Sequence, residues 1–339
     1  MRNESCETFD AASAPARIGA ALPLSLSARP KQPGTGRSSL FLRVRNYDLD
    51  ATLDSGQAFR WQRQGRAWLG VIGQRPVRLT SSPDGIRAET AGPINDWQWL
   101  RDYLQSDLDL AAVLAAFPDD LPMRNAVAAC RGLRILRQDP WECLASFILS
   151  STKQIVQIRQ IVSLLCERFG EPLGGGGLRS PENETLPAVA DRRYRSFPTA
   201  ERLAAVTEAD LRGCKMGFRA PYLLAAARQI AGGKLNLERL RRLPLAAARD
   251  ELVQLPGVGN KIADCVLLFA YGFDGAFPVD VWVERALRQL YFAHRRVGGK
   301  RLRHFAATHF GPRAGYAQQY LFHYIRIHKL DREGVKALK

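Results

Sequence analysis

The sequence lacks any pair of cysteines close enough to form a C-x-x-C motif. Closely spaced pairs of that kind hold structural metals or form redox-active disulfides. The six cysteines are instead spread along the chain, at Cys6, Cys130, Cys143, Cys166, Cys214 and Cys265. This spacing indicates reduced thiols inside a cell.

Long hydrophobic runs are also missing. No stretch approaches the ~18 apolar residues that a membrane span needs, so we expect a soluble protein that does not enter membranes. The most apolar part of the N-terminal region, residues 18–26, is broken by Pro23 and lacks the basic start and cleavage site of a secretion signal. Residues 1–38 show no sustained periodicity and predict a flexible arm, with a transit peptide as the alternative.

Acidic residues are too few to balance the basic ones. The 339 residues include 49 Lys+Arg against 33 Asp+Glu, a formal net charge of +16. Such an excess suits a protein that displaces counterions from a polyphosphate, although ribosomal, membrane-surface and heparin-binding proteins share it. With 46% hydrophobic residues, the chain is long enough for two or three domains with buried cores.

The chain divides by its hydrophobic pattern into two structured parts. Short apolar alternation between glycine- and proline-containing turns over residues 41–87 predicts a small antiparallel sheet, and residues 97–117 have a helical pattern. After Asp139-Pro140, a helix-start signal, the pattern is almost entirely helical. We therefore predict an α+β protein with an arm at 1–38, a sheet-containing domain at 39–135 and a helical domain at 136–339.

A glycine-rich turn connects two helical patterns at Leu255-Pro256-Gly257-Val258-Gly259-Asn260-Lys261. This arrangement is a helix–hairpin–helix. Its glycines permit a tight turn, so that backbone N–H groups at the start of the second helix can approach a phosphate closely. An ordinary helical hairpin is the alternative interpretation.

Lys261 falls in the first turn of the second helix, where the helix dipole disfavours added positive charge and so favours a neutral, nucleophilic amine. Nineteen residues later, Asp280 precedes a predicted helix at 281–291, which it could cap while facing the same cleft. A lysine and a carboxylate are the pair that imine chemistry at a sugar carbon requires. A solvated lysine and a purely structural cap are the alternative.

These features resemble the helix–hairpin–helix DNA glycosylase superfamily and, within it, the eukaryotic-type 8-oxoguanine DNA glycosylase/AP lyases. The likeness runs from about Leu42 to Gln319. It rests on the hairpin and on five separated blocks: Ser55-Gly56-Gln57-Ala58-Phe59-Arg60-Trp61, Leu136-Arg137-Gln138-Asp139-Pro140-Trp141-Glu142-Cys143, Gly217-Phe218-Arg219-Ala220, Lys261-Ile262-Ala263-Asp264-Cys265 and Gly315-Tyr316-Ala317-Gln318.

The resemblance implies roles for individual residues in the lesion pocket. Lys261 would be the Schiff-base nucleophile and Asp280 its catalytic carboxylate. The carbonyl of Gly56 would accept the N7 hydrogen that oxidised guanine has and guanine lacks, while Gln318 would bind the Watson–Crick edge of the base. Cys265 and Phe322 would form the two sides of the stacking pocket, although without the family both would be taken for core residues.

Further residues are implied to contact DNA. Phe218 resembles the aromatic wedge that fills the hole left by a flipped nucleotide, and Arg219 its neighbour that contacts the unpaired cytosine. The hairpin glycines Gly257 and Gly259 would bring backbone to phosphate. Three features depart from the family: Thr152-Lys153-Gln154 replaces an asparagine triplet, Gln157 replaces a cytosine-reading arginine, and Trp282 replaces a histidine that touches phosphate.

The resemblance thus implies an intracellular, monomeric enzyme that binds double-stranded DNA containing 8-oxoguanine, excises the base and nicks the strand. No cofactor or catalytic metal is required, and one monovalent cation can be held by hairpin carbonyls around Val253 to Val258. The absence of a cysteine cluster after Cys265 argues against an iron–sulfur loop. The alternatives are a glycosylase for another damaged base and a non-catalytic helix–hairpin–helix DNA-binding module.

Overall fold

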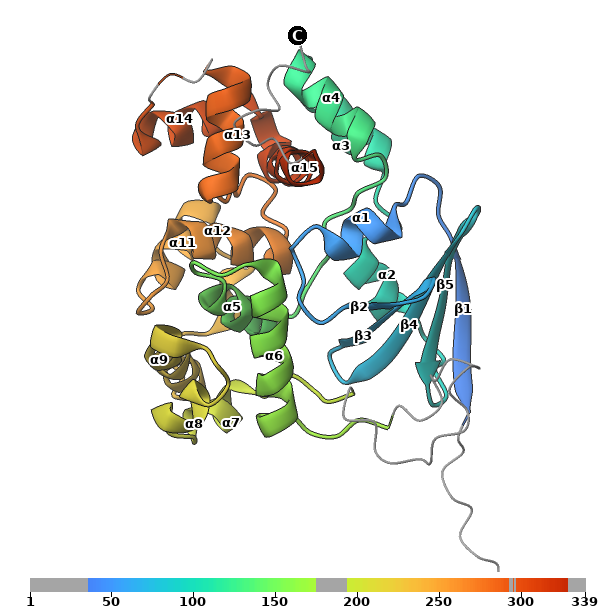
Figure 1. The fold of residues 1–339 in the computed structure, drawn as a ribbon, viewed down its shortest axis with the longest axis vertical. Coiled ribbons are helices and arrows are strands. Elements are labelled where there is room, and N and C mark those ends of the chain that lie inside the picture. Colours follow the sequence, from blue (N-terminus) through green and yellow to red (C-terminus); the bar gives the residue numbers. More distant parts are fainter. Residues whose placement is uncertain (1–35, 175–193, 293–294, 296, 329–339) are drawn as a thin grey trace, which may run out of the picture. The chain divides into compact units, whose positions relative to one another are not determined.

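The computed structural model describes residues 36–174, 194–292, 295 and 297–328. The predicted arm lies outside these residues, except for its last three positions. Within the described part, an antiparallel sheet comes first and is followed by a helical region, so the predicted α+β class is confirmed (Figure 1).

The sheet has five strands in the described residues, in the spatial order β1-β5-β4-β3-β2, and every neighbouring pair is antiparallel. Its strands are β1 (Arg37–Arg43), β2 (Gln62–Gln64), β3 (Ala67–Ile72), β4 (Arg75–Ser82) and β5 (Gly85–Ala91). Helices α1 (Leu49–Asp54) and α2 (Gln98–Leu104) pack on one of its faces through buried leucines against Trp61 and Trp68. This small core holds the loop after α1, which carries Gly56, in place.

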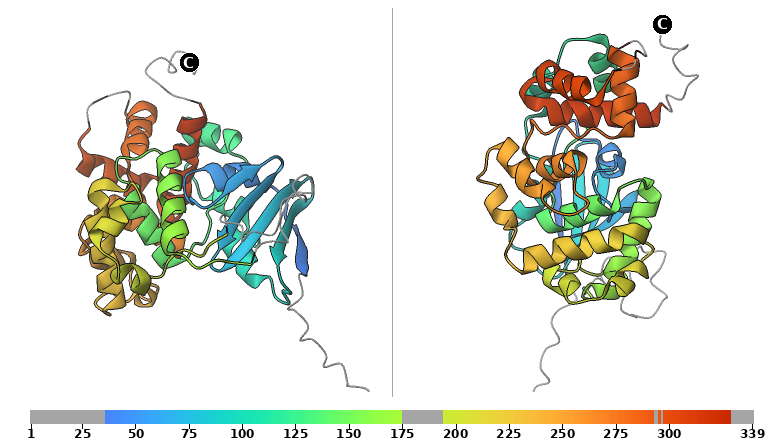
Figure 2. Two further views of the ribbon diagram at one scale, coloured as in Figure 1. Left: turned by 60° about the horizontal axis from the view of Figure 1, so that its bottom comes forward. Right: turned by 90° about the vertical axis from the view of Figure 1, so that its left-hand side faces the viewer.

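Helices form the rest of the described chain. They are α3 (Leu110–Ala115), α4 (Leu121–Ala129), α5 (Pro140–Leu149), α6 (Ile155–Phe169), α7 (Ala200–Ala204), α8 (Glu208–Arg212), α9 (Ala220–Ala231), α10 (Leu237–Leu240), α11 (Leu245–Val253), α12 (Asn260–Val266), α13 (Val281–Tyr291), α14 (Gly299–His309) and α15 (Ala314–Ile327). A π-helical turn (Leu267–Tyr271) continues α12. The left view of Figure 2 shows α5 and α6 between the sheet and the α7–α9 group.

Capping residues mark several helix starts where the sequence predicts them. The Asp139 carboxylate accepts a hydrogen bond from the Glu142 N–H at 2.8 Å, and Pro140 occupies the first turn of α5. Helix α13 spans the predicted residues 281–291. These helix-start signals are confirmed. They can be predicted from sequence because each depends only on residues within one helical turn of the helix start.

The predicted helical stretch over residues 97–117 is wrong as one continuous helix. Gln105 adopts a left-handed conformation with φ +52° and ends α2, and its N–H bonds back to the carbonyl of Asp102. Asp109 then caps α3 by accepting hydrogen bonds from the N–H groups of Ala111 and Ala112. The apolar periodicity continues across the turn between α2 and α3. For that reason it did not show where one helix ends and the next begins.

Candidate active site

The side chain of Lys261 lies where α5 and α12 meet. Its Nζ donates a hydrogen bond to Ser150 Oγ at 3.0 Å and lies 5.3 Å from the centroid of the Phe147 ring. Ser150 follows the last residue of α5, and Lys261 is the second residue of α12. The hydrogen bond joins the start of α12 to the end of α5, so the amine has a partner from a distant part of the sequence.

Asp280 caps α13, as the sequence predicts. One carboxylate oxygen, Oδ1, accepts hydrogen bonds from the N–H groups of Trp282 at 3.0 Å and Val283 at 2.8 Å. Burial raises the pKa of Asp280, and these two N–H groups, together with the positive charges of Lys261 and Arg326, oppose that rise. The carboxylate is therefore a desolvated acid whose charged form is supported by its surroundings.

Lys261 and Asp280 line one cavity of about 360 Å³. A volume of this size is typical of small-molecule sites. Its walls include seven of the twelve predicted site residues: Gly56, Lys261, Cys265, Asp280, Trp282, Gln318 and Phe322. A second hollow of about 50 Å³, beside Arg60 and Tyr194, contains none of them. The structure thus brings both predicted catalytic residues and all four predicted base-binding residues together.

Two groups in this cavity have hydrogen-bonding capacity that the described protein does not use. Gln318 is 4% exposed, and its Oε1 has no hydrogen-bond partner. Within the described residues, no group donates to the Gly56 carbonyl. Because a buried amide without a partner is costly, an unused amide that faces a cavity marks a place where a ligand can bind.

Gly56 also leaves room that no other residue would. Its φ is +81°, and a Cβ added there would lie 2.6 Å from Cδ1 of Ile155 and 3.5 Å from Cε1 of Phe322. A side chain at this position would be strained and would enter the cavity wall. Glycine therefore keeps the backbone accessible to whatever occupies the cavity.

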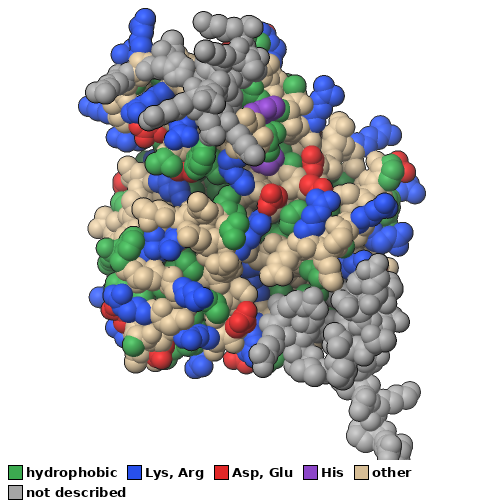
Figure 3. Space-filling view, viewed as in Figure 1, with side chains coloured by type: hydrophobic (Ala, Val, Ile, Leu, Met, Phe, Trp, Pro, Cys, Tyr) green, Lys and Arg blue, Asp and Glu red, His purple; other side chains and the backbone are tan. Residues whose placement is uncertain are grey.

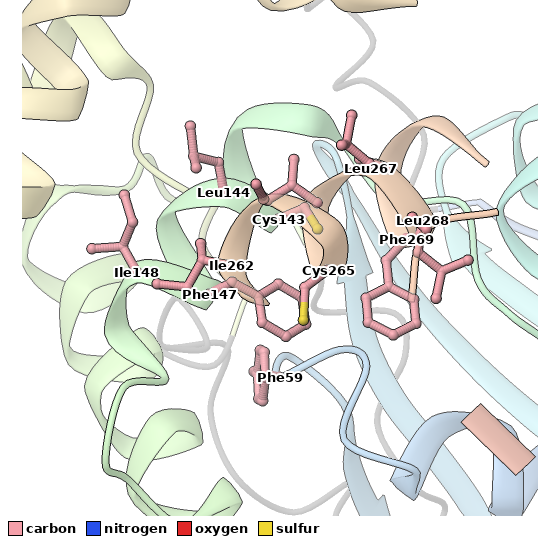
Figure 4. Packing of buried hydrophobic residues seen from close by; sticks show 14 of the residues in the cluster. Phe59, Cys143, Leu144, Phe147, Ile148, Ile262, Cys265, Leu267, Leu268 and Phe269 are labelled. Carbon is pink, nitrogen blue, oxygen red and sulfur yellow. The ribbon is translucent and has the colours of Figure 1, made fainter. Parts of the chain in front are cut away.

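The remaining walls are largely aromatic. Phe147 and Phe269 stack at 5.5 Å between ring centroids, and Phe59 meets Phe147 edge to face. Figure 4 shows Phe59, Phe147 and Phe269 on the same side as the sulfur of Cys265, with contributions from the loop after α1, α5, α12 and the π-helical turn. Burial raises the pKa of the Cys265 thiol to about 12, so the sulfur is a neutral, polarisable surface. Flat apolar walls of this kind suit a planar ring.

Three predicted DNA-binding residues form a separate cluster outside the cavity. Arg219 donates to the Ser151 carbonyl and, at 2.6 Å, to Thr152 Oγ1. Its guanidinium carbon lies 4.2 Å from the centroid of the Phe218 ring, which is 53% exposed. An exposed aromatic ring thus lies beside a buried arginine at this place on the surface.

The two hairpin glycines differ in what they require. Gly257 has φ +79°, and a Cβ there would come within 2.5 Å of the Tyr222 ring, which meets Phe218 edge to face at 6.4 Å. Gly259 has extended backbone, and a Cβ there would meet nothing within 4 Å. The first glycine is needed for packing within the protein, whereas the second leaves space on the surface.

The residues that depart from the family pattern can also be located in the structure. Gln157 accepts a hydrogen bond from the Gln154 N–H at 3.1 Å and forms a capping box at the start of α6. Trp282 lines the cavity and lies under the guanidinium of Arg285, 5.0 Å from the ring centroid. Lys153 also lines the cavity. The asparagine and histidine positions are thus occupied by side chains of different chemistry.

Ser150 and Arg326 also line the cavity, although neither is among the site residues predicted from the sequence. Ser150 is part of a Ser-Ser pair that only its contact with Lys261 makes informative. Arg326 lies four residues after Phe322, and this helical spacing could have revealed it.

No cluster of histidine, cysteine, aspartate or glutamate suited to a metal ion occurs among the residues that the structure describes. In the same part of the chain, no helix combines the length and apolar character needed to cross a bilayer.

The family models match most of the chain. The N-terminal domain of 8-oxoguanine DNA glycosylase matches residues 39–144, and the HhH-GPD superfamily base excision DNA repair protein matches residues 145–308. The N-glycosylase/DNA lyase OGG1 of Arabidopsis thaliana is 30% identical over 292 residues, which cover 81% of this chain and 76% of the relative. The N-glycosylase/DNA lyase of Saccharomyces cerevisiae is 31% identical over 268 residues, covering 72% and 68% of the two chains.

A solved structure agrees with these matches. The 8-oxoguanine glycosylase/lyase of Clostridium acetobutylicum, in complex with double-stranded DNA containing cytosine opposite 8-oxoguanine, superposes with a TM-score of 0.75 and 31% identity. The match covers 86% of this chain and 99% of that one. These matches show that the chain belongs to the 8-oxoguanine DNA glycosylase family of helix–hairpin–helix base excision repair proteins.

Proposed function

We propose that this protein excises 8-oxoguanine from duplex DNA and then nicks the abasic strand. The observation that carries the proposal is a single cavity that holds a lysine amine, a buried carboxylate and two unused hydrogen-bonding groups suited to a base. Relatives named N-glycosylase/DNA lyase and a structural neighbour bound to 8-oxoguanine-containing DNA support it.

The first step cuts the glycosidic bond. The amine of Lys261, positioned by Ser150, attacks C1′ of the extruded nucleotide through its nitrogen lone pair as the bond from C1′ to the base breaks. The base leaves with the bonding electron pair and takes up a proton, while the lysine nitrogen loses one. The Asp280 carboxylate stabilises the positive charge that develops on the sugar, and its desolvated position strengthens that interaction.

The second step cuts the strand. The bond from C1′ to the ring oxygen breaks, the ring oxygen keeps the electron pair and takes up a proton, and the lone pair of the Lys261 nitrogen forms an iminium with C1′. Loss of a proton from C2′ then supplies the electrons that expel the 3′ phosphate, which is β-elimination. Hydrolysis of the imine releases the enzyme. The chain's own groups suffice for these steps, so the proposal requires no cofactor.

Selection of the damaged base depends on the loop after α1. The Gly56 carbonyl accepts the N7 hydrogen of 8-oxoguanine, an atom that guanine lacks, while the Gln318 amide binds the Watson–Crick edge. Phe322 and Cys265 enclose the ring between them. This assignment gives an occupant to both unused groups in the cavity.

Extrusion of the nucleotide depends on the outer cluster and the hairpin. Phe218 fills the vacated stack, Arg219 and Thr152 face the unpaired cytosine, and the backbone at Gly259 approaches phosphate. Positive charge is spread over both the sheet and the helices on the face shown in Figure 3, which suits a long DNA backbone. The protein would act as a monomer inside the cell, where its DNA is.

A monovalent cation at the hairpin is part of this proposal. Within the described residues, the carbonyls of Val253 and Val258 accept no hydrogen bond, and the Leu255 carbonyl accepts one from the Val258 N–H. Free carbonyls in a tight turn suit such an ion. A higher melting temperature in potassium chloride than in choline chloride of equal ionic strength would be the expected sign.

Borohydride trapping tests the proposed activity. The protein is incubated with a duplex that contains 8-oxoguanine opposite cytosine, and we expect a covalent adduct that disappears in Lys261→Gln. Lys153→Gln is the matched control, because Lys153 also lines the cavity and its loss should leave the adduct in place. If the folded, unmutated protein forms no adduct, the lyase activity is refuted. Trapping only on duplexes with alkylated bases would instead support a different glycosylase.

A further inference from the structure

Helix α15 presents three cavity residues at intervals of four. Gln318, Phe322 and Arg326 all line the cavity, and this spacing places them on one face of the helix. Gln318 is buried, whereas Phe322 and Arg326 are half-buried. The row therefore runs from the floor of the cavity toward its mouth: an amide, then an aromatic ring, then a cation.

Arg326 is held in place at this mouth. Its Nη1 donates a hydrogen bond to the Asp54 carbonyl at 3.1 Å, and its guanidinium carbon lies 5.5 Å from the centroid of the Phe322 ring. The Asp54 carboxylate is already paired with Arg159 at 2.7 Å. Among the described residues, Arg326 thus has no carboxylate in direct contact, and most of its five donors are unused.

The positions of Lys261 and Asp280 determine which part of the extruded nucleotide would lie near Arg326. Lys261 and Asp280 fix where C1′ must lie, and a base bound to Gln318 fills the deeper part of the cavity. The phosphates attached to the same sugar then lie toward the mouth. An arginine fork matches a phosphate in geometry as well as in charge. Trp282, which also lines the cavity, brings no charge of its own.

We propose that Arg326 binds a backbone phosphate of the extruded nucleotide, a contact that forms only when a nucleotide has left the stack. This inference rests on the proposed function, because it requires a flipped nucleotide in the cavity. It makes Arg326 a residue that favours the flipped state over the intact duplex. Two other roles compete with it: a purely structural brace for the loop after α1, and a contact with the base itself.

Salt-dependent binding to two duplexes tests the proposal. One duplex carries a stable tetrahydrofuran abasic analogue opposite cytosine, and the other is undamaged. We expect Arg326→Met to weaken binding to the abasic-analogue duplex about tenfold. The slope of log K against log salt should become shallower by about 0.9, the value for one lost phosphate contact. Binding to the undamaged duplex should stay within about twofold of the unmutated protein.

Two further variants provide controls. Arg159→Met removes a positive charge from the other side of Asp54, outside the cavity, and should change neither the slope nor the preference for the abasic analogue. Arg326→Lys retains the charge and should recover most of the slope. Melting temperatures of all variants show whether each remains folded.

Each contrary result overturns the proposal in a recognisable way. Equal weakening on both duplexes, or an unchanged slope, would make Arg326 a structural brace. A loss seen only with 8-oxoguanine, measured in the Lys261→Gln background so that the base is not cut, would make it a contact to the base. Failure of the unmutated protein to form a borohydride adduct would refute the proposed activity separately, because the abasic-analogue measurement does not depend on catalysis.

Discussion

Replacing Gln318 by methionine should increase stability and impair excision. Its Oε1 is buried without a partner, and an unsatisfied buried acceptor costs about 1–3 kcal/mol. Methionine has a similar length and no such group, so we expect Gln318→Met to raise the free energy of unfolding by about 1 kcal/mol. For a chain of this size that corresponds to roughly 2 °C in melting temperature.

The same change should slow excision of 8-oxoguanine. Loss of the hydrogen bonds to the base removes about 1–3 kcal/mol, or about five- to 150-fold in single-turnover rate. The adduct with a preformed abasic site should be affected much less, because that substrate has no base to bind. Thermal melting and single-turnover excision of the same preparations measure both effects.

Gln319 provides the matched control. It is also buried and lines the cavity, but its Nε2 donates to the Ser55 carbonyl at 3.3 Å. Gln319→Met should therefore lower the free energy of unfolding by about 0.5–1.5 kcal/mol. If Gln318→Met lowers stability by as much, or leaves excision unchanged, Gln318 is a structural residue and the argument from its unused oxygen is wrong.

Three other predictions concern the catalytic carboxylate, the hairpin and base selectivity. Because burial raises the pKa of Asp280 in the folded protein, its ionised form costs stability at neutral pH, and that stability returns as the pH falls through the raised folded pKa toward the ordinary pKa of an unfolded aspartate. Asp280→Asn keeps a capping oxygen, so it should hold or raise the melting temperature at pH 7 while abolishing trapping. Asp280→Ala also removes the cap and should lower the free energy of unfolding by about 1 kcal/mol. Equal melting temperatures of the two variants would contradict this. Gly257→Ala should cost more than about 1 kcal/mol, since it combines a positive φ with a clash against Tyr222. Gly259→Ala should leave urea unfolding almost unchanged and weaken DNA binding in an anisotropy titration. If Gly259→Ala were less stable than Gly257→Ala, this account of the turn would be refuted. Gln157 contributes a cap in place of a cytosine-reading arginine. The unmutated protein should therefore prefer cytosine opposite the lesion less strongly than Gln157→Arg does, by about 1–3 kcal/mol, when excision rates opposite the four bases are compared. A preference above about a hundredfold in the unmutated protein would mean that Arg219 or another group compensates.

Several features could be predicted from the sequence because they depend on residues close together in the chain. The caps at Asp139 and Asp280 each bond to N–H groups two or three residues ahead. The hairpin turn needs glycine at a position of positive φ, which Gly257 supplies. Local backbone requirements of this kind leave a direct trace in residue type. The family likeness extended them to Gly56, Gln318 and Phe322, which the structure places in the cavity.

Other features depend on residues that are distant in sequence. The hydrogen bond between Lys261 and Ser150 joins residues 111 positions apart, and that between Arg326 and Asp54 joins residues 272 apart. No local pattern encodes such pairs, because they arise from how helices pack rather than from how each one forms. The break at Gln105 was missed for a related reason, since apolar periodicity continued through a turn.

The sequence by itself therefore determined the α+β order of the chain, the hairpin, the caps of α5 and α13, and a lysine and an aspartate suited to imine chemistry. Only the tertiary structure decided that these two residues share one cavity, that Ser150 positions the amine, and that Gln318 keeps an unused oxygen. The physical reason is how far apart in the sequence the interacting residues lie. Turns and caps are satisfied within a few residues, whereas a binding site is a surface shared by segments that meet only after the core has packed.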